Sequence, residues 1–335
     1  MTDQKTSAGL GEIAGTLGLT VYGDVGGTMQ TVLSYTVTGE VPGALAWLTG
    51  NFTGTENMGI QIAQPWDNDG TLGLNIYGDV GGTLQPVFAS SDMGQGSGAL
   101  AWLTGNFTGT GNDFTEIAQL WDNNGTLGLI VYGLGNTVFE NPDMNRGSGA
   151  LAFLAGNFTG SGGTEIAQLW DNGGTLGLIV YGIGNGTLET VFENPDMNQG
   201  SGALAFLAGY FTGSGTTTQI AQPWDNDGTL EMIVYGNVGD GNLGTVYASP
   251  MHQGSRALAF LTGNFIGSGH TQIAQTRDNN GTLQLLIYGD IGNGQLSTVF
   301  SNDVSQIPFA LAWVTGDFTG TGNTQILQPW MTVLG

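Results

Sequence analysis

A tryptophan followed by an aspartate recurs along the chain, and this is the pattern whose possible chemistry is easiest to name. Four copies keep both residues: Trp66-Asp67, Trp121-Asp122, Trp170-Asp171 and Trp224-Asp225. An indole can pack against the C–H face of a sugar ring, while a neighbouring carboxylate or amide bonds to the sugar hydroxyls. These residues are our candidate ligand-binding residues, and we assign no catalytic residue.

The same pairs also have a purely structural interpretation. Tryptophan is bulky and commonly buried in part, so the ring could pack between repeats, and Asp-Asn is typical of a tight turn. Two later copies depart from the pattern, as Arg277-Asp278 and Trp330-Met331. The sequence leaves both interpretations open, and the exposure of the pairs on one face of the molecule would distinguish them.

The elements that carry these pairs belong to an internal repeat. The segment G-T-L-x-x-x-x-Y-G begins at six glycines spaced 49 to 55 residues apart: Gly15, Gly70, Gly125, Gly174, Gly228 and Gly281. A second segment, A-L-A-[WF]-[LV]-x-G-x-F, also occurs six times. Because no linker of distinct composition interrupts the series, we predict one domain over residues 1–335, with residues 1–10 a flexible N-terminal segment.

Each repeat contains four short runs that are typical of β-strands. In residues 99–143 these runs are 99–107, 115–121, 126–132 and 137–139, rich in β-branched and aromatic residues and bounded by Gly, Asn and Asp. Asp-Gly, Asn-Gly or Gly-Gly pairs between the second and third runs suit type I′ hairpin turns. Six four-stranded antiparallel units in series predict an all-β, six-bladed β-propeller.

The order of the runs also predicts how the ring closes. The chain opens with third-strand and fourth-strand runs at 16–22 and about 31–36, and ends with first-strand and second-strand runs at 310–318 and 324–330. We therefore expect the last blade to combine N-terminal and C-terminal strands, which removes a free sheet edge. The small Ala residues of the first run favour the innermost position, where the blades crowd together.

The segment 315–327, T-G-D-F-T-G-T-G-N-T-Q-I-L, resembles the FG-GAP/VCBS-type propeller repeat, whose pattern is roughly G-D-F-N-G-D-G-x-x-D-I. Similar segments begin at Gly50, Gly105, Gly156, Gly209, Gly263 and Gly316. The resemblance implies a propeller. It also implies a functional range that includes adhesion heads, lectins, toxin-associated modules and a few enzymes.

Loops of that family often bind calcium, but the loops of this chain lack the necessary carboxylates. The first ligand position keeps a carboxylate only at Asp317 and is Asn or Tyr elsewhere, whereas Ca²⁺ takes six to eight oxygen ligands, several of them charged. We expect no metal and no cofactor, with the hydroxyl and amide groups closing each loop internally.

Composition excludes several classes of partner. The chain has 4 basic and 27 acidic residues, a formal net charge of −23, and no cysteine. Four scattered cations cannot form a phosphate-binding surface, so nucleic acid is not an expected partner. No apolar stretch is long enough for a membrane span, and no signal peptide is visible, so we expect no membrane insertion and either a cytoplasmic location or non-classical export.

Three functions remain to be weighed. The repeated Trp-Asp-Asn edge favours a non-catalytic, lectin-like carbohydrate-binding propeller with several similar sites on one rim, and multiple weak sites would act through avidity. The alternative is a structural or protein-interaction module of a larger assembly or toxin, indicated by the low charge density. An enzyme is less favoured, because the two histidines fit no nucleophile–base motif. The expected partners are glycans or a protein.

Overall fold

The computed structural model describes most of the chain and shows the arrangement of its strands. The described residues are 13–24, 28–41, 43–54, 59–79, 84–109, 114–213, 216–241, 243–254, 257–280, 282–289, 291, 296–304 and 310–333. The segment 1–10, which we predict to be flexible, lies outside them. Among the described residues, no helix is long and apolar enough to cross a membrane.

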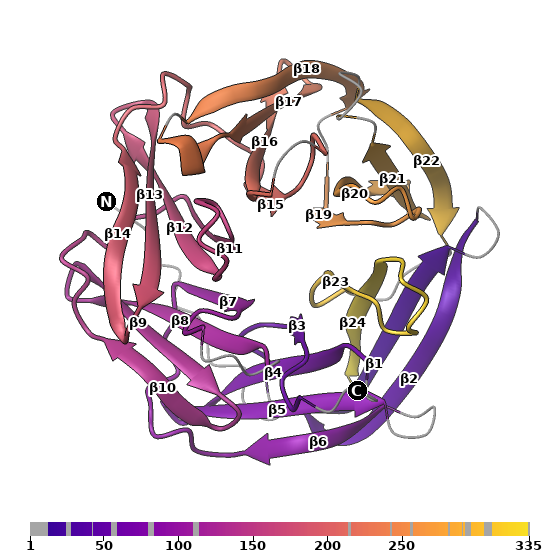
Figure 1. Cartoon of the computed structure of the whole chain (residues 1–335). Coiled ribbons are helices and arrows are strands. Elements are labelled where there is room, and N and C mark those ends of the chain that lie inside the picture. The colour runs from indigo at the N-terminus through magenta and orange to yellow at the C-terminus, as the bar shows by residue number, and fades with distance from the viewer. Residues whose placement is uncertain are drawn as a thin grey trace, which may run out of the picture.

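Six four-stranded antiparallel sheets stand around a central axis, and we number these blades 1 to 6 in chain order (Figure 1). Blade 1 comprises β3 (Leu48–Gly50), β4 (Gln61–Asn68), β5 (Thr71–Asp79) and β6 (Leu84–Ser90). Blade 2 comprises β7 (Ala101–Gly105), β8 (Glu116–Asn123), β9 (Thr126–Gly133) and β10 (Asn136–Asn141). Blade 3 comprises β11 (Ala152–Gly156), β12 (Glu165–Asn172), β13 (Thr175–Gly184) and β14 (Thr187–Asn194).

The remaining blades follow the same plan. Blade 4 comprises β15 (Leu207–Gly209), β16 (Gln219–Asn226), β17 (Thr229–Gly236) and β18 (Gly244–Gly254), with a short 3-10 turn at Val238–Asp240. Blade 5 comprises β19 (Ala259–Gly263), β20 (Gln272–Asn279), β21 (Thr282–Gly289) and β22 (Ser297–Val304). In every blade the short first strand faces the centre of the ring (Figure 1). The predicted six-bladed propeller is thus confirmed.

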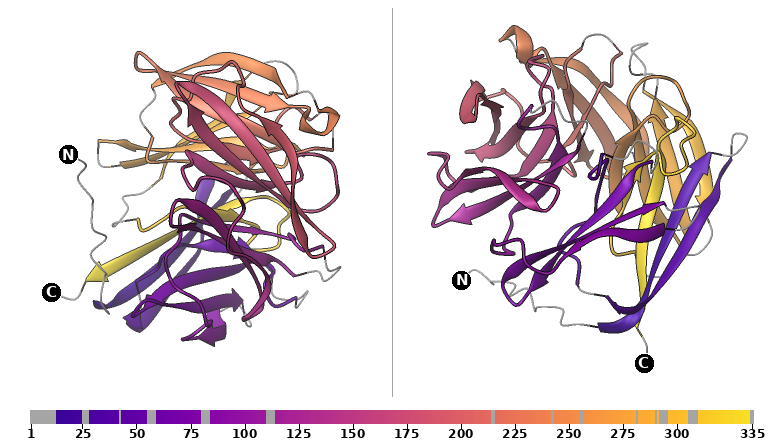
Figure 2. Two further views of the ribbon diagram at one scale, coloured as in Figure 1. Left: turned by 90° about the vertical axis from the view of Figure 1, so that its left-hand side faces the viewer. Right: turned by 60° about the horizontal axis from the view of Figure 1, so that its bottom comes forward.

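Blade 6 joins the two ends of the chain, as the order of the runs predicts. It comprises β23 (Val314–Gly316) and β24 (Gln325–Val333) from the C-terminal side, and β1 (Ile13–Asp24) and β2 (Met29–Val41) from the N-terminal side. Strand β1 pairs antiparallel with β24, from Gly15 opposite Val333 to Tyr22 opposite Ile326. The two strands lie side by side in both views of Figure 2.

The hydrophobic core lies between the blades. In β8, residues 116 to 120 are all buried, so both faces of the strand are covered. One cluster combines Leu120 and Leu127 of blade 2 with Ile166 and Tyr181 of blade 3. Each sheet is packed against a neighbour on either side, which explains why its middle strands are buried almost throughout, on both faces, instead of alternating between buried and exposed residues.

Glycine at the end of each inner strand lets neighbouring blades approach. A Cβ atom built on Gly105 would lie 2.4 Å from the Thr164 side chain of the next blade. Thr164 Oγ1 accepts a hydrogen bond from the Asn106 amide at 2.9 Å, and the Thr164 amide donates to the Asn106 carbonyl at 3.1 Å. A threonine bonded in this way to the preceding blade also joins blade 1 to 2, 3 to 4, 4 to 5 and 5 to 6. Between blades 6 and 1 the equivalent residue is Ile60, which packs against Gly316.

The hairpins between the second and third strands have the geometry that their sequences predict. In blades 1 to 4 both central residues of the turn have positive φ, for example 55° at Asn124 and 92° at Gly125. This is the type I′ arrangement, whose twist matches that of the flanking strands. In blades 1 to 4, where the tryptophan is present, these hairpins place the aspartate that follows it at the same end of the blade.

Candidate ligand-binding sites between the blades

The four Trp-Asp pairs end the second strands β4, β8, β12 and β16, so the repetition of the ring brings them to one face of the molecule. Each tryptophan is half-buried, and each aspartate is exposed. The pairs are therefore neither sealed between the blades nor fully in solvent. The packing interpretation describes the tryptophan, whose ring is half covered by protein. The ligand-binding interpretation describes the aspartate, which remains exposed.

A glycine on the third strand provides the surface on which the indole packs. Gly128 faces Trp121 across the strand pair, and a Cβ atom built on Gly128 would lie 2.3 Å from the indole ring. The same relation holds for three further pairs: Gly73 with Trp66, Gly177 with Trp170, and Gly18 with Trp330. This glycine is not among the predicted site residues, although the repeated G-T-L-G motif contains it.

The aspartates close the hairpin turns. Asp122 Oδ1 accepts a hydrogen bond from the Gly125 amide at 2.7 Å, and the other three aspartates accept one from the equivalent glycine. At Asp171, hydrogen bonds from Ser201 and from the Gly174 amide lower the pKa of the carboxyl group. A carboxylate offers about four acceptor positions on its two oxygens, so these bonds use only part of its capacity.

The indole nitrogens differ between blades. Trp330 Nε1 donates to Thr20 Oγ1 at 3.0 Å. The Nε1 atoms of Trp66 and Trp224 are buried and have no hydrogen-bond partner among the described residues. A ligand on these two rings would meet the ring surface and not the N–H group.

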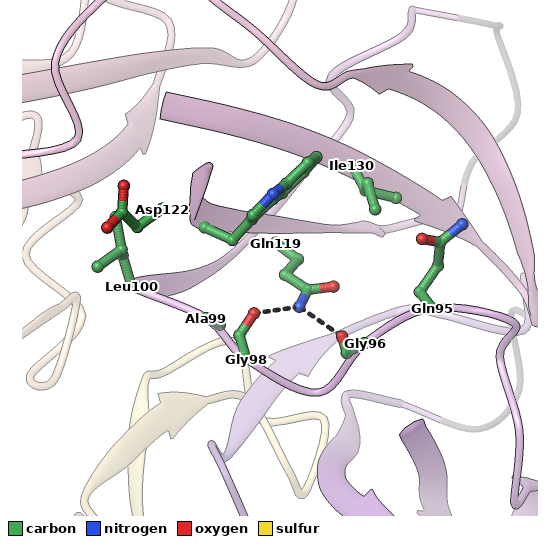
Figure 3. Close-up of a pocket in the computed structure, with 9 residues that line it drawn as sticks. Gln95, Gly96, Gly98, Ala99, Leu100, Gln119, Asp122 and Ile130 are labelled. Carbon is green, nitrogen blue, oxygen red and sulfur yellow. Dashed lines mark hydrogen bonds between the residues drawn. The ribbon is translucent and has the colours of Figure 1, made fainter. Parts of the chain in front are cut away.

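A cavity of about 460 Å³ lies beside Trp121, between blade 2 and the connector that leads into it from blade 1 (Figure 3). It is lined by Gln95, Gly96, Gly98, Ala99 and Leu100 of the connector, Gln119, Trp121 and Asp122 of β8, and Ile130 of β9. The structure thus brings the predicted residues Trp121 and Asp122 together with a connector wall that the sequence pattern did not indicate.

A buried glutamine fixes that wall. Gln119 Nε2 donates to the carbonyl oxygens of Gly96 at 3.0 Å and Gly98 at 2.7 Å, as the dashed lines in Figure 3 show. Gln119 Oε1 accepts the hydroxyl of Tyr132 at 2.5 Å. Gln168 with Tyr181, and Gln222 with Tyr235, hold the connectors into blades 3 and 4 in the same way.

This network settles the place of the tyrosine series. This series consists of the tyrosines of the repeated G-T-L-x-x-x-x-Y-G segment, Tyr22, Tyr77, Tyr132, Tyr181, Tyr235 and Tyr288. All six rings are buried, and each hydroxyl donates to a buried glutamine of the second strand of its own blade. Burial raises the pKa of all six tyrosines, to about 12 at Tyr22.

The cavity combines apolar walls with a few polar groups at its edge. Its apolar part consists of the indole of Trp121, the side chain of Leu100, which is 47% exposed, and the side chains of Ala99 and Ile130. Its polar side chains are Asp122, Gln95 and Gln119. Such a site suits a neutral ligand with one apolar face and several hydroxyl groups.

The loops that resemble calcium sites are closed by the side chain that begins the second strand of the same blade. Gln61 Oε1 accepts the amides of Phe52 and Thr53, and Glu116 Oε2 accepts those of Phe107 and Thr108. Among the described residues, no three His, Cys, Asp or Glu side chains gather as a metal site would require.

Comparison with known proteins identifies the architecture alone. No family model matches the chain, and no curated protein matches it. Among solved structures, 28 chains match. AofleA from Arthrobotrys oligospora is 12% identical, with a TM-score of 0.50 over 97% of this chain and 91% of its own.

Two rhamnogalacturonan lyases also match in structure. YesW is 14% identical, with a TM-score of 0.43 over 97% of this chain and 81% of its own. The Bacillus licheniformis enzyme PL11 is 12% identical, with a TM-score of 0.42 over 92% of this chain and 79% of its own. At these identities, a function for this chain has to be argued from its own residues.

Proposed function

We propose that this protein is a non-catalytic carbohydrate-binding propeller with several similar sites between its blades. The observation that carries the proposal is the cavity in which the Trp121 ring, the Asp122 carboxylate and a fixed connector meet. We also propose that its repeats are of the FG-GAP/VCBS type.

Binding follows from the chemistry of these groups. The C–H face of a sugar ring packs on the indole, which supplies apolar contact area without strict directionality. The sugar hydroxyls donate to Asp122, whose charge strengthens such hydrogen bonds. Because Gln119 already holds the connector in place, little ordering is needed when the sugar enters, and pre-organisation of this kind favours affinity.

The charges around the sites favour neutral sugars. The connector into blade 3 carries Arg146 where the connector into blade 2 carries Gln95. The Arg146 guanidinium bonds to both carboxylate oxygens of Glu193, at 3.1 and 2.7 Å, so its charge is balanced. With a formal net charge of −23, the molecule as a whole repels anions.

A glycan array followed by calorimetric titration tests the proposal. We expect neutral glycans to bind, and the double variant Trp121→Ala, Trp170→Ala to lose at least about tenfold in apparent affinity for multivalent glycans, because two contributions to avidity disappear. Trp102→Phe is the matched control, since phenylalanine occupies the equivalent position in blade 3 as Phe153. An array without hits, or unchanged binding by the double variant, would contradict the proposal.

A further inference from the structure

The residue that faces the tryptophan across the second and third strands differs between blades. It is glycine in blades 1, 2, 3 and 6, at Gly73, Gly128, Gly177 and Gly18. In blade 4 it is Glu231, opposite Trp224. In blade 5 both members of the pair have changed, to Arg277 and Gln284, and Arg277 Nε donates to Gln284 Oε1 at 2.5 Å.

The glycine is required for the position of the indole. A Cβ atom at Gly73, Gly128 or Gly177 would lie 2.2 to 2.4 Å from the ring, and real Cβ contacts shorter than 3.0 Å essentially never occur. Glu231 has a Cβ atom at this place. The Trp224 ring therefore cannot cover residue 231 in the way that Trp121 covers Gly128.

The Glu231 side chain also changes the hydrogen bonds at the hairpin. In blades 2 and 3, Asn123 Nδ2 donates to the Pro142 carbonyl at 2.8 Å, and Asn172 Nδ2 donates to the Pro195 carbonyl at 2.9 Å. In blade 4, Asn226 Nδ2 donates instead to Glu231 Oε1 at 2.7 Å. The glutamate thus extends along the strand toward the hairpin, on the exposed side where a ligand would approach.

We propose that the residue facing the tryptophan decides whether a blade has a working site, and that Glu231 closes the site of blade 4. The inference rests on the proposed carbohydrate binding. It assigns Trp224 and Asp225 to packing and to the hairpin turn. The complete Trp-Asp sites are then confined to the adjacent blades 1, 2 and 3, because blade 6 keeps the facing Gly18 but has Met331 in place of the aspartate.

Exchange of the facing residues tests the inference. Titration of the wild-type protein with a panel of methyl glycosides of neutral hexoses identifies a probe sugar and gives its stoichiometry. Glu231→Gly is expected to add one binding site per chain, and Trp224→Ala in that background to remove it again. Gly128→Glu in blade 2, which copies the natural residue of blade 4, is expected to lose one site. Trp224→Ala in the wild-type chain is the matched control, and is expected to leave the stoichiometry unchanged.

The outcomes separate the two proposals. An unchanged stoichiometry in Glu231→Gly, or a site lost from the wild-type chain by Trp224→Ala, would overturn the closing role of Glu231 while leaving carbohydrate binding in place. If the wild-type protein binds no glycoside, carbohydrate binding fails, and a crystal structure of Glu231→Gly still tests the closing role. In that structure the Trp224 ring should cover position 231, and an unmoved ring would refute the inference.

Discussion

The side chain that begins each second strand shows how a single residue type can change without loss of structure. This position is Glu at Glu116 and Glu165, and Gln in the other four blades. In blade 1, Gln61 Nε2 donates to Thr53 Oγ1 at 2.5 Å, whereas in blade 3 the Thr159 hydroxyl donates to Glu165 Oε1. A threonine hydroxyl can donate or accept, so it serves either partner.

We therefore expect Glu165→Gln to change the free energy of unfolding by less than about 1 kcal/mol, because the hydroxyl of Thr159 can reverse its role. Glu165→Ala should cost about 2 to 4 kcal/mol, since it leaves the loop amide and hydroxyl groups without their acceptor. Urea denaturation measures both values. A large loss in Glu165→Gln would show that the charge itself is needed.

The one loop that lacks this threonine contains an unpaired group. In blade 5 the threonine is replaced by Ile266, and Gln272 Nε2 is buried with no hydrogen-bond partner among the described residues. Ile266 is 37% exposed, so removing it costs little apolar burial. Ile266→Thr should raise the free energy of unfolding by about 0.5–1.5 kcal/mol, the usual net value of a hydrogen bond. Thermal unfolding measures this change, and a lower melting temperature would count against it.

At the scale of the elements, the inner strands depend on close approach between blades. Gly105→Ala places a methyl group where the Thr164 side chain now lies, so blades 2 and 3 must separate or shift. We expect a loss of about 1–3 kcal/mol, as for other overpacking substitutions. Gly184→Ala is the matched control, because no atom lies within 4 Å of a Cβ built there. Equal losses of stability in the two variants would mean that alanine is unfavourable in either strand, and that the contact between position 105 and Thr164 is not the cause.

The sequence predicted the strands and their closure because period, turn residues and strand order are all local signals. The order of runs at the two chain ends is enough to place β1 beside β24. The connector wall of the cavity was not predictable, because nothing in G-S-G-A-L indicates that its carbonyls will meet Gln119. Gly128 was missed for a related reason: in a chain with 61 glycines, a glycine that supports an indole looks like any other.

At the scale of the whole molecule, six buried tyrosines link the stability of the ring to pH. Burial raises the pKa of each tyrosine in the folded state above its unfolded value of 10.0, to about 12 at Tyr22. Their contribution is fully present below pH 10 and declines as the pH rises through the folded pKa values, because the unfolded chain then releases more protons.

We expect the protein to unfold cooperatively as the pH rises from about 10 toward 12 and beyond, with the buried tyrosines ionising in the same transition. Ultraviolet absorbance of tyrosinate and circular dichroism, recorded together, measure the two events. Tyr22→Phe should shift the pH midpoint of unfolding upward, once the variant's altered stability at neutral pH has been taken into account. Ionisation of all tyrosines well before the loss of circular dichroism would argue against this linkage.

The pairing of β1 with β24 also determines how the ring responds to mechanical force. Gly15 lies directly opposite Val333 at one end of this strand pair. A pull on the two chain ends therefore loads the hydrogen-bonded pairs one after another, as in a zipper, and not all at once, as in a sheared pair. The closing blade, which joins the two ends of the chain, should thus be the first part to open under tension.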